Sequence, residues 1–237
     1  MPSIRLIVGL GNPGEKYIGT RHNAGADFVS ALAKQNGIEL KTEKKLAGRL
    51  GRGTLAGHDV RLLIPDTFMN HSGKAVGLAA KYFQIAPEQI VIAHDELDMP
   101  PGASRFKFDG GHGGHNGLRD VIPAIGGSKA FWRLRVGIGH PGQASKVSGW
   151  VLSKASKIEQ QLIDLSIDES LSALPLLLDG EEHESRRAVP PLPLPPLSLP
   201  NYSAAAVAAV HHLRSMAATA AFDAPGASHS AGWQEAP

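Results

Sequence analysis

The residues best suited to chemistry are a histidine and an aspartate far apart in the chain. His22 stands just before an expected helix, and Asp95 follows an apolar run (residues 90–94) that is typical of a buried strand. A carboxylate at such a strand exit can accept the Nδ1–H of a histidine, which leaves Nε2 free to take a proton from water. The neighbouring Glu96 and Asp98 are alternative carboxylates, which we expect to be solvated or to cap a loop. The competing interpretation of His22 is a surface or capping residue at a helix start.

Two asparagines could assist a reaction with water. The chain has no cysteine and no G-x-S-x-G motif, so an activated water is the simplest nucleophile. Asn12 lies in a tight turn after the first expected strand, and Asn70 lies directly before the second expected helix. Their amides can donate hydrogen bonds to a developing oxyanion, with Phe68 and Met69 as an apolar wall for a peptide or a base. The alternatives are a purely structural turn at Asn12 and a simple helix cap at Asn70.

The turn that contains Asn12 formally matches the dinucleotide-binding fingerprint G-x-G-x-x-G (residues 9–14). A dinucleotide site requires a helix that opens at this turn, so that its N–H groups meet the pyrophosphate. Pro13 removes one donor, and residues 17–20 delay the expected helix to the region of Asn23. We therefore expect no nucleotide cofactor.

A glycine-rich stretch with two histidines (residues 108–117) is the most unusual segment of the chain. Its glycines allow backbone N–H groups to line a concavity that accepts an anion, and Asn116 stands at the start of the next expected helix. The alternative is a metal site that uses His112 and His115, with His22 or Asp95 as further ligands. Because a flexible glycine loop is a poor rigid platform for a metal, we expect no metal site.

Basic residues flank this glycine-rich stretch on both sides. The net charge is only +2, so any nucleic-acid footprint must be local rather than global. Their joint position suggests contacts with phosphate, whereas the alternative for each single residue is a solvated charge at a sheet edge. The residues concerned are Arg105, Lys107, Arg133, Arg135 and Lys146.

Strands and helices that alternate along the chain must position these residues. Apolar β-branched runs predict the strands, and apolar residues at helical spacing predict the helices. This alternation predicts an α/β domain built on a mixed sheet. The expected strands are residues 4–10, 48–55, 59–64, 90–94 and 134–138, and the expected helices are residues 23–36, 72–83 and 157–178, with one more beginning at residue 116.

The character of the chain changes near residue 185. Residues 185–237 are rich in proline and alanine and lack lysine, so we expect a disordered low-complexity tail after a single domain over residues 1–184. The chain starts without the shape of a signal peptide and contains no apolar run of membrane-spanning length. Together with the absence of cysteine, these features predict a cytoplasmic protein with no membrane partner.

Several blocks resemble, in order, signature segments of bacterial-type peptidyl-tRNA hydrolases. They are GLGNPGEKY, TRHNAG, TFMN followed by SG, HDELD, GGHGGHNGLRD and RLRVGIGHPG, and the resemblance covers roughly residues 4–184. The resemblance implies one α/β domain with a twisted mixed sheet and helices on both faces. It also implies an enzyme that hydrolyses the ester between peptide and tRNA in peptidyl-tRNA, and we expect it to act as a monomer without a cofactor.

The resemblance also assigns roles to residues of this chain. It makes His22 the catalytic base, held and polarised by Asp95, and it makes Asn12 and Asn70 the amides that place the water and ester and stabilise the oxyanion. The residues that it assigns to substrate binding are Tyr17, Met69 and Asn116 in the crevice, and Lys107 and Arg135, supported by Arg105, for the tRNA phosphates.

Two departures from the family pattern bear on function. Ala144 stands where family members often carry a lysine, so tRNA binding through that loop is expected to be weaker here. The family pattern also ends in a short helix, whereas this chain continues into the Pro/Ala-rich tail.

The rival functions are a tRNA-binding module without catalysis, a nucleotide-dependent oxidoreductase and a hydrolase of small esters. The combination of His22, Asp95 and the two asparagines argues against the first, Pro13 against the second and the basic residues against the third.

Overall fold

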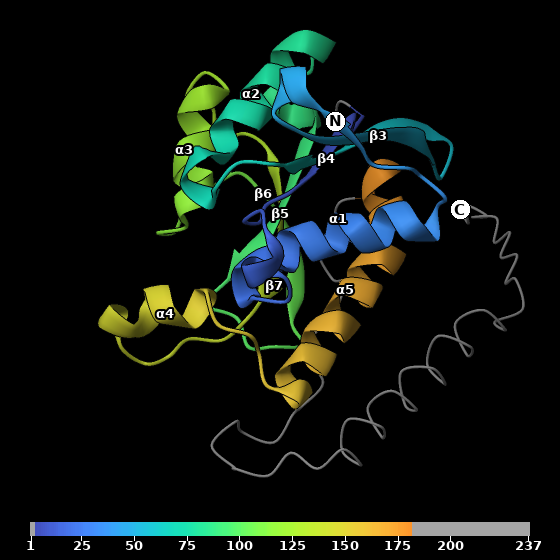
Figure 1. Cartoon of the computed structure of the whole chain (residues 1–237). Helices are drawn as coiled ribbons and strands as arrows, with labels where there is room; N and C mark the ends of the chain where they lie inside the picture. The colour runs from blue at the N-terminus through green and yellow to red at the C-terminus, as the bar shows by residue number, and fades with distance from the viewer. Residues whose placement is uncertain (1–2, 182–237) are drawn as a thin grey trace, which may run out of the picture. The chain divides into compact units, whose positions relative to one another are not determined.

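A 7-stranded mixed sheet forms the centre of the computed structural model, which describes residues 3–181 (Figure 1). The strands lie in the order β2-β3-β4-β1-β5-β7-β6. The four central strands are parallel to one another, whereas β2, β3 and β6 pair in antiparallel fashion at the two edges. The bounds are β1 Leu6–Gly9, β2 Lys41–Glu43, β3 Gly48–Leu55, β4 His58–Pro65, β5 Ile90–Glu96, β6 Ser104–Phe108 and β7 Trp132–Gly137.

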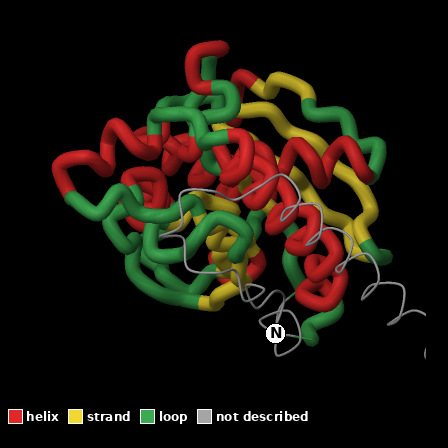
Figure 2. The backbone as a smooth tube through the Cα atoms, turned by 90° about the horizontal axis from the view of Figure 1, so that it is seen from below, coloured by secondary structure: helices red, strands yellow, loops and turns green. Residues whose placement is uncertain are grey.

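Helices cover both faces of this sheet, as predicted (Figure 2). One face packs against α1 (Ala24–Gln35) and α5 (Lys157–Leu178), and the other packs against α2 (Ser72–Phe83) and α3 (Asn116–Ala124). Alternate side chains of the central strands therefore enter two separate apolar clusters, because successive strand residues point to opposite faces. A short helix, α4 (Val147–Val151), lies between β7 and α5 in the sequence.

Most of the expected elements are confirmed. The helices over residues 72–83 and 157–178 have the predicted bounds, and α1 begins one residue later and ends one residue earlier than expected. The predicted hairpin is formed by β3 and β4. The expected domain boundary at residue 184 and the Pro/Ala-rich tail lie outside the described residues.

The segment between β5 and β7 contains a strand that the sequence analysis missed. Ser104 and Phe106 are buried while Arg105 and Lys107 are exposed, which is the alternation of a strand with one covered face. This strand, β6, pairs with β7 and places Arg105 opposite Arg135. The short run was hidden beside the glycine-rich loop, and only pairing with a distant strand reveals it.

Two sequence expectations about helix starts have clear outcomes. Asn70 is not the cap of α2, because a 3-10 turn over Met69–His71 precedes this helix and His71 occupies the cap position. The helix after the G-x-G-x-x-G turn is delayed as predicted, since α1 begins only at Ala24. Within residues 3–181, no helix combines the length and the apolar character needed to cross a membrane.

Candidate active site

The candidate site lies where the parallel strands end. The carboxyl ends of β1, β4 and β5 are neighbours in the sheet, and ligands favour this edge of an α/β sheet. The turn after β1 carries Asn12, the 3-10 turn after β4 carries Met69 and Asn70, and β5 carries Asp95 close to its end. His22 belongs to a 3-10 turn directly before α1.

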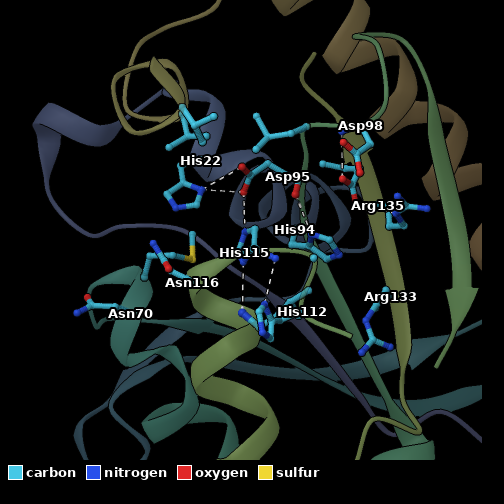
Figure 3. Close-up of a pocket in the computed structure, with 18 of the residues that line it drawn as sticks. His22, Asn70, His94, Asp95, Asp98, His112, His115, Asn116, Arg133 and Arg135 are labelled. Atoms are coloured by element: carbon cyan, nitrogen blue, oxygen red, sulfur yellow. Dashed lines mark hydrogen bonds and ion pairs between the residues drawn. The ribbon is translucent and has the colours of Figure 1, made fainter. Parts of the chain in front are cut away.

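His22 and Asp95 meet, although 73 positions separate them in the sequence (Figure 3). The Nδ1 atom of His22 lies 2.9 Å from Oδ1 and 3.0 Å from Oδ2 of Asp95. Both residues are buried, with 7% of His22 and 4% of Asp95 exposed. Because Nδ1–H donates to the carboxylate, the ring presents an unprotonated Nε2, which is the arrangement that a general base needs.

Asp95 also accepts a hydrogen bond from a second histidine. Nε2 of His115 lies 2.8 Å from Oδ1 of Asp95, and Nδ1 of His115 accepts a hydrogen bond from the backbone N–H of Leu118 at 3.3 Å. These two contacts assign the proton of His115 to Nε2. In the sequence His115 suggested only a metal ligand, and its contact with Asp95 was not predicted. Its position at the N-cap of the helix that begins at Asn116, three residues before Leu118, could have suggested a structural role.

The electrostatics of Asp95 favour its ionised form. Burial by itself raises the pKa of this carboxyl group, but the imidazoles of His115 and His22 outweigh burial and hold the pKa well below its usual range. Asp95 is therefore a carboxylate at neutral pH. A carboxylate is the form that can accept hydrogen bonds from both histidines.

His94 completes a group of three histidines around Asp95. Its Nδ1–H donates to the backbone carbonyl of Asp95 at 2.8 Å, and its ring lies against that of His115 with the centroids 5.0 Å apart. Burial and the nearby His115 lower the pKa of His94 to about 3, so it stays neutral. This residue packs behind the site and was not singled out by the sequence analysis.

Asn12 is held so that its amide group can act as a donor. Asn23 fixes its backbone from both sides, accepting from the N–H of Asn12 at 2.8 Å and donating to its carbonyl at 3.1 Å. The side-chain oxygen of Asn12 accepts the backbone N–H of Met69 at 2.8 Å. With its oxygen engaged, Asn12 presents its NH₂ group at the crevice that it lines.

The other predicted crevice residues surround this centre. Met69 is buried, and half-buried Tyr17 packs edge-to-face on the exposed ring of Phe68 at a centroid distance of 6.2 Å. Asn116 is exposed at the start of α3 and lines the crevice. Asn70 also lines it, but its side chain is exposed and extends away from the His22–Asp95 pair (Figure 3).

A crevice of about 1050 Å³ connects these residues to the glycine-rich loop. Three sequence-predicted basic residues, Lys107, Arg133 and Arg135, line it, whereas Arg105 lies on the exposed side of β6 directly opposite Arg135. The guanidinium of Arg135 is bound to Glu96, with its Nε 2.7 Å from the carboxylate. Glu96 thus has a defined partner in addition to its cap on the N–H of Asp98.

Arg133 differs from these basic residues because it is buried. Only 3% of it is exposed, and its guanidinium donates to the carbonyls of Lys129, Phe131 and Gly110. Burial lowers its pKa to about 10. Arg133 therefore holds the start of the glycine-rich loop rather than facing solvent, which its place in the sequence did not indicate.

His22, Asp95 and His115 could also be considered as metal ligands. Their ligand atoms lie within 4.8 Å of one another. However, both histidines direct N–H groups at the carboxylate at 2.8–3.0 Å, and a metal would have to replace those hydrogen bonds. His112 is engaged elsewhere, since its Nδ1 accepts the N–H of Gly114 at 3.0 Å. The arrangement fits proton transfer better than metal binding.

Comparison with known proteins places this chain in one family. The family model described as "Peptidyl-tRNA hydrolase" matches residues 6–190. The chain is 58% identical over 177 residues to the peptidyl-tRNA hydrolase of Shewanella loihica, covering 75% of this chain and 91% of that protein. It is 55% identical over 181 residues to that of Pseudomonas aeruginosa, covering 76% and 93%. A crystal structure of the Acinetobacter baumannii peptidyl-tRNA hydrolase superimposes with a TM-score of 0.77 at 54% identity, covering 81% of this chain and 98% of that one.

Proposed function

Because the chain belongs to the peptidyl-tRNA hydrolase family, we propose that it hydrolyses the ester between the peptide and the tRNA of peptidyl-tRNA. The observation that carries this proposal is the buried His22–Asp95 pair at the edge of a crevice lined by asparagines and basic residues. Ester hydrolysis needs a base, an oxyanion donor and a place for the nucleic acid, and each requirement has a candidate in this crevice.

In the proposed reaction, Nε2 of His22 takes a proton from a water molecule that attacks the ester carbonyl. Asp95 keeps the ring in the required tautomer and stabilises the imidazolium that forms. The NH₂ group of Asn12 donates to the developing oxyanion, and Asn70 joins it once its side chain, which extends away from the His22–Asp95 pair in the free protein (Figure 3), turns toward the bound substrate. Collapse of the tetrahedral intermediate breaks the bond to the ribose oxygen, which receives the proton from His22 and leaves as free tRNA.

The basic residues account for binding of the nucleic acid. We assign Lys107 and Arg135, with Arg105 in support, to phosphates of the tRNA, while Tyr17, Met69 and Asn116 contact the peptide and the terminal nucleotide. Phosphate contacts of this kind carry no sequence information, which suits an enzyme that must accept many tRNAs. We also propose that the protein acts as a monomer, because His22, Asp95 and Asn12 already meet within one chain, and that it acts in the cytoplasm, where translation takes place.

The proposal is tested by measuring release of tRNA from N-acetyl-aminoacyl-tRNA, with the unblocked aminoacyl-tRNA as the control substrate. We expect rapid cleavage of the blocked substrate alone, and a His22→Ala variant slowed by about 10²–10⁴-fold with unchanged tRNA binding. Free aminoacyl-tRNA should be a poor substrate, because its charged α-ammonium loses solvation where a peptide amide forms a hydrogen bond. Tight tRNA binding without turnover would instead support the rival tRNA-binding module.

A further inference from the structure

Arg21, the residue before His22, is buried and joins three segments of the chain. Only 5% of it is exposed. Its guanidinium donates to the hydroxyl of Ser153 at 2.7 Å, to the carbonyl of Lys154 at 3.0 Å and to the carboxylate of Glu159 at 3.0 Å. Its carbon Cζ also lies 3.7 Å from the centre of the Trp150 ring, a close cation–π contact.

These contacts hold α4 from behind. Other residues of this helix and its end line the crevice, and we call them the α4 wall: Val147, Ser148, Val151 and Leu152. The indole N–H of Trp150 donates to the carbonyl of Gly139 at 2.9 Å, which ties the same helix to the end of β7. Arg21 and Gly139 therefore anchor one short helix that covers one side of the site.

The same arginine connects the α4 wall to the catalytic turn. Its backbone N–H donates to the carbonyl of Ser153 at 3.1 Å, and Thr20 forms an isolated β-bridge with Lys154. His22 follows directly in the 3-10 turn Arg21–Asn23. The backbone directly before His22 is thus bonded to residues 153 and 154, which follow α4.

We propose that Arg21 is a positioning residue for substrate binding. Through Trp150 it keeps the α4 wall in the conformation that receives the substrate, and through its backbone it keeps His22 in register with that wall. A five-residue helix has too few internal hydrogen bonds to be stable alone. Without the guanidinium–indole contact, the fraction of molecules with a formed wall falls, and the apparent affinity for the substrate falls by the same fraction. This inference rests on the proposed function.

The test compares Trp150→Leu, Arg21→Lys and the double variant in steady-state hydrolysis of N-acetyl-aminoacyl-tRNA. Trp150→Leu should raise KM roughly 5- to 30-fold with little change in kcat, because the hydrogen bonds of Arg21 to Ser153 and Lys154 beside the His22 turn stay in place. Arg21→Lys should raise KM similarly and also lower kcat, because the lysine cannot reproduce the fork that supports the His22 turn. The double variant should raise KM by less than the product of the two single effects, since the two changes share the guanidinium–indole contact. Trp150→Phe keeps an aromatic face but loses the N–H that donates to Gly139, so its KM should lie between those of the wild type and Trp150→Leu.

Ile167→Val is the matched control, because it removes a buried methyl group from α5 without touching α4. Hydrogen exchange provides a second readout: amides of residues 144–153 should exchange faster in Trp150→Leu and Arg21→Lys, whereas those of α5 should be protected as in the wild type. A KM in Trp150→Leu equal to that of Ile167→Val would overturn the proposal, as would additive effects in the double variant. If the wild-type protein showed no hydrolysis, the proposed function would be refuted. Hydrogen exchange of residues 144–153 would then still decide whether Arg21 holds α4.

Discussion

Replacing Asp95 by asparagine tests the general base while keeping the size and shape of the side chain, because one carboxylate oxygen is exchanged for an NH₂ group. Oδ1 of Asp95 accepts Nε2–H of His115 at 2.8 Å, and the tautomer of His115 is held by the N–H of Leu118. The asparagine must therefore turn its single oxygen toward His115. Its NH₂ group then replaces Oδ2, which lies 3.0 Å from Nδ1 of His22. His22 can accept from this NH₂ group only by moving its own proton from Nδ1 to Nε2. Keeping the proton on Nδ1 would leave its N–H opposed to the NH₂ group and sharing Oδ1, 2.9 Å away, with His115, so we expect the proton to move.

A protonated Nε2 cannot accept a proton from water, so the contribution of general-base catalysis is lost. That contribution is typically about 10²–10⁴-fold, equivalent to about 3–5 kcal/mol of transition-state stabilisation. We expect Asp95→Asn to lower the single-turnover rate on N-acetyl-aminoacyl-tRNA by this factor while tRNA binding stays within about twofold of the wild type.

The matched control is Asp98→Asn, which makes the same chemical change at an exposed position of the same crevice. It should leave the single-turnover rate within about twofold of the wild type. If Asp95→Asn, correctly folded by circular dichroism, retains more than about a tenth of the wild-type rate, the tautomer argument is wrong. An equal loss in both variants would show that the effect is one of net charge in the crevice.

Three further changes test other parts of the structure. Burial and the nearby Asp164 raise the pKa of Asp27 to about 6, so the free energy of unfolding of the wild type should fall as the pH rises from about 4 to about 6. In urea denaturation at pH 8, Asp27→Asn should be more stable than the wild type by about 1–3 kcal/mol. Ala144→Lys adds a cation to the crevice and should lower KM at low salt, and it should increase the slope of log KM against log salt concentration by at most about 0.9. An unchanged slope would place residue 144 away from the tRNA. In Gly25→Ala the new Cβ would lie 2.1 Å from a carbonyl oxygen of β5, so a loss of more than about 2 kcal/mol is expected, against almost none for Gly149→Ala, which has open space.

Much of the site could be anticipated from local patterns. The apolar run before Asp95 predicts a buried strand whose exit faces the ligand edge of the sheet, and helical spacing after His22 places that residue at a helix start. These predictions depend on a few neighbouring residues, which is why they are accurate to within one or two positions. The meeting of the two side chains came from the family resemblance, because no periodicity relates residues 73 positions apart.

Other features depend on contacts between distant segments. His115 reaches Asp95 only because α3 begins beside the end of β5, and Arg133 is buried against the carbonyls of Lys129, Phe131 and Gly110. Arg133 and Arg135 share one face of β7, since side chains two positions apart point the same way, and only the placement of the glycine-rich loop decides which of them meets its carbonyls. The strand β6 illustrates the same limit, since its short alternation gains meaning only when β7 pairs with it.

By itself, the sequence determined most of the strands and helices, the place of His22 and Asp95 at element ends, and the absence of thiol chemistry, because these follow from residue types and short-range spacing. The tertiary structure alone decided which basic residues face the crevice, which histidine shares the carboxylate, and how Arg21 holds α4 beside the site. Those outcomes are set by the strand order and by packing across the sheet edge, where free energies depend on the relative placement of whole elements rather than on any local segment.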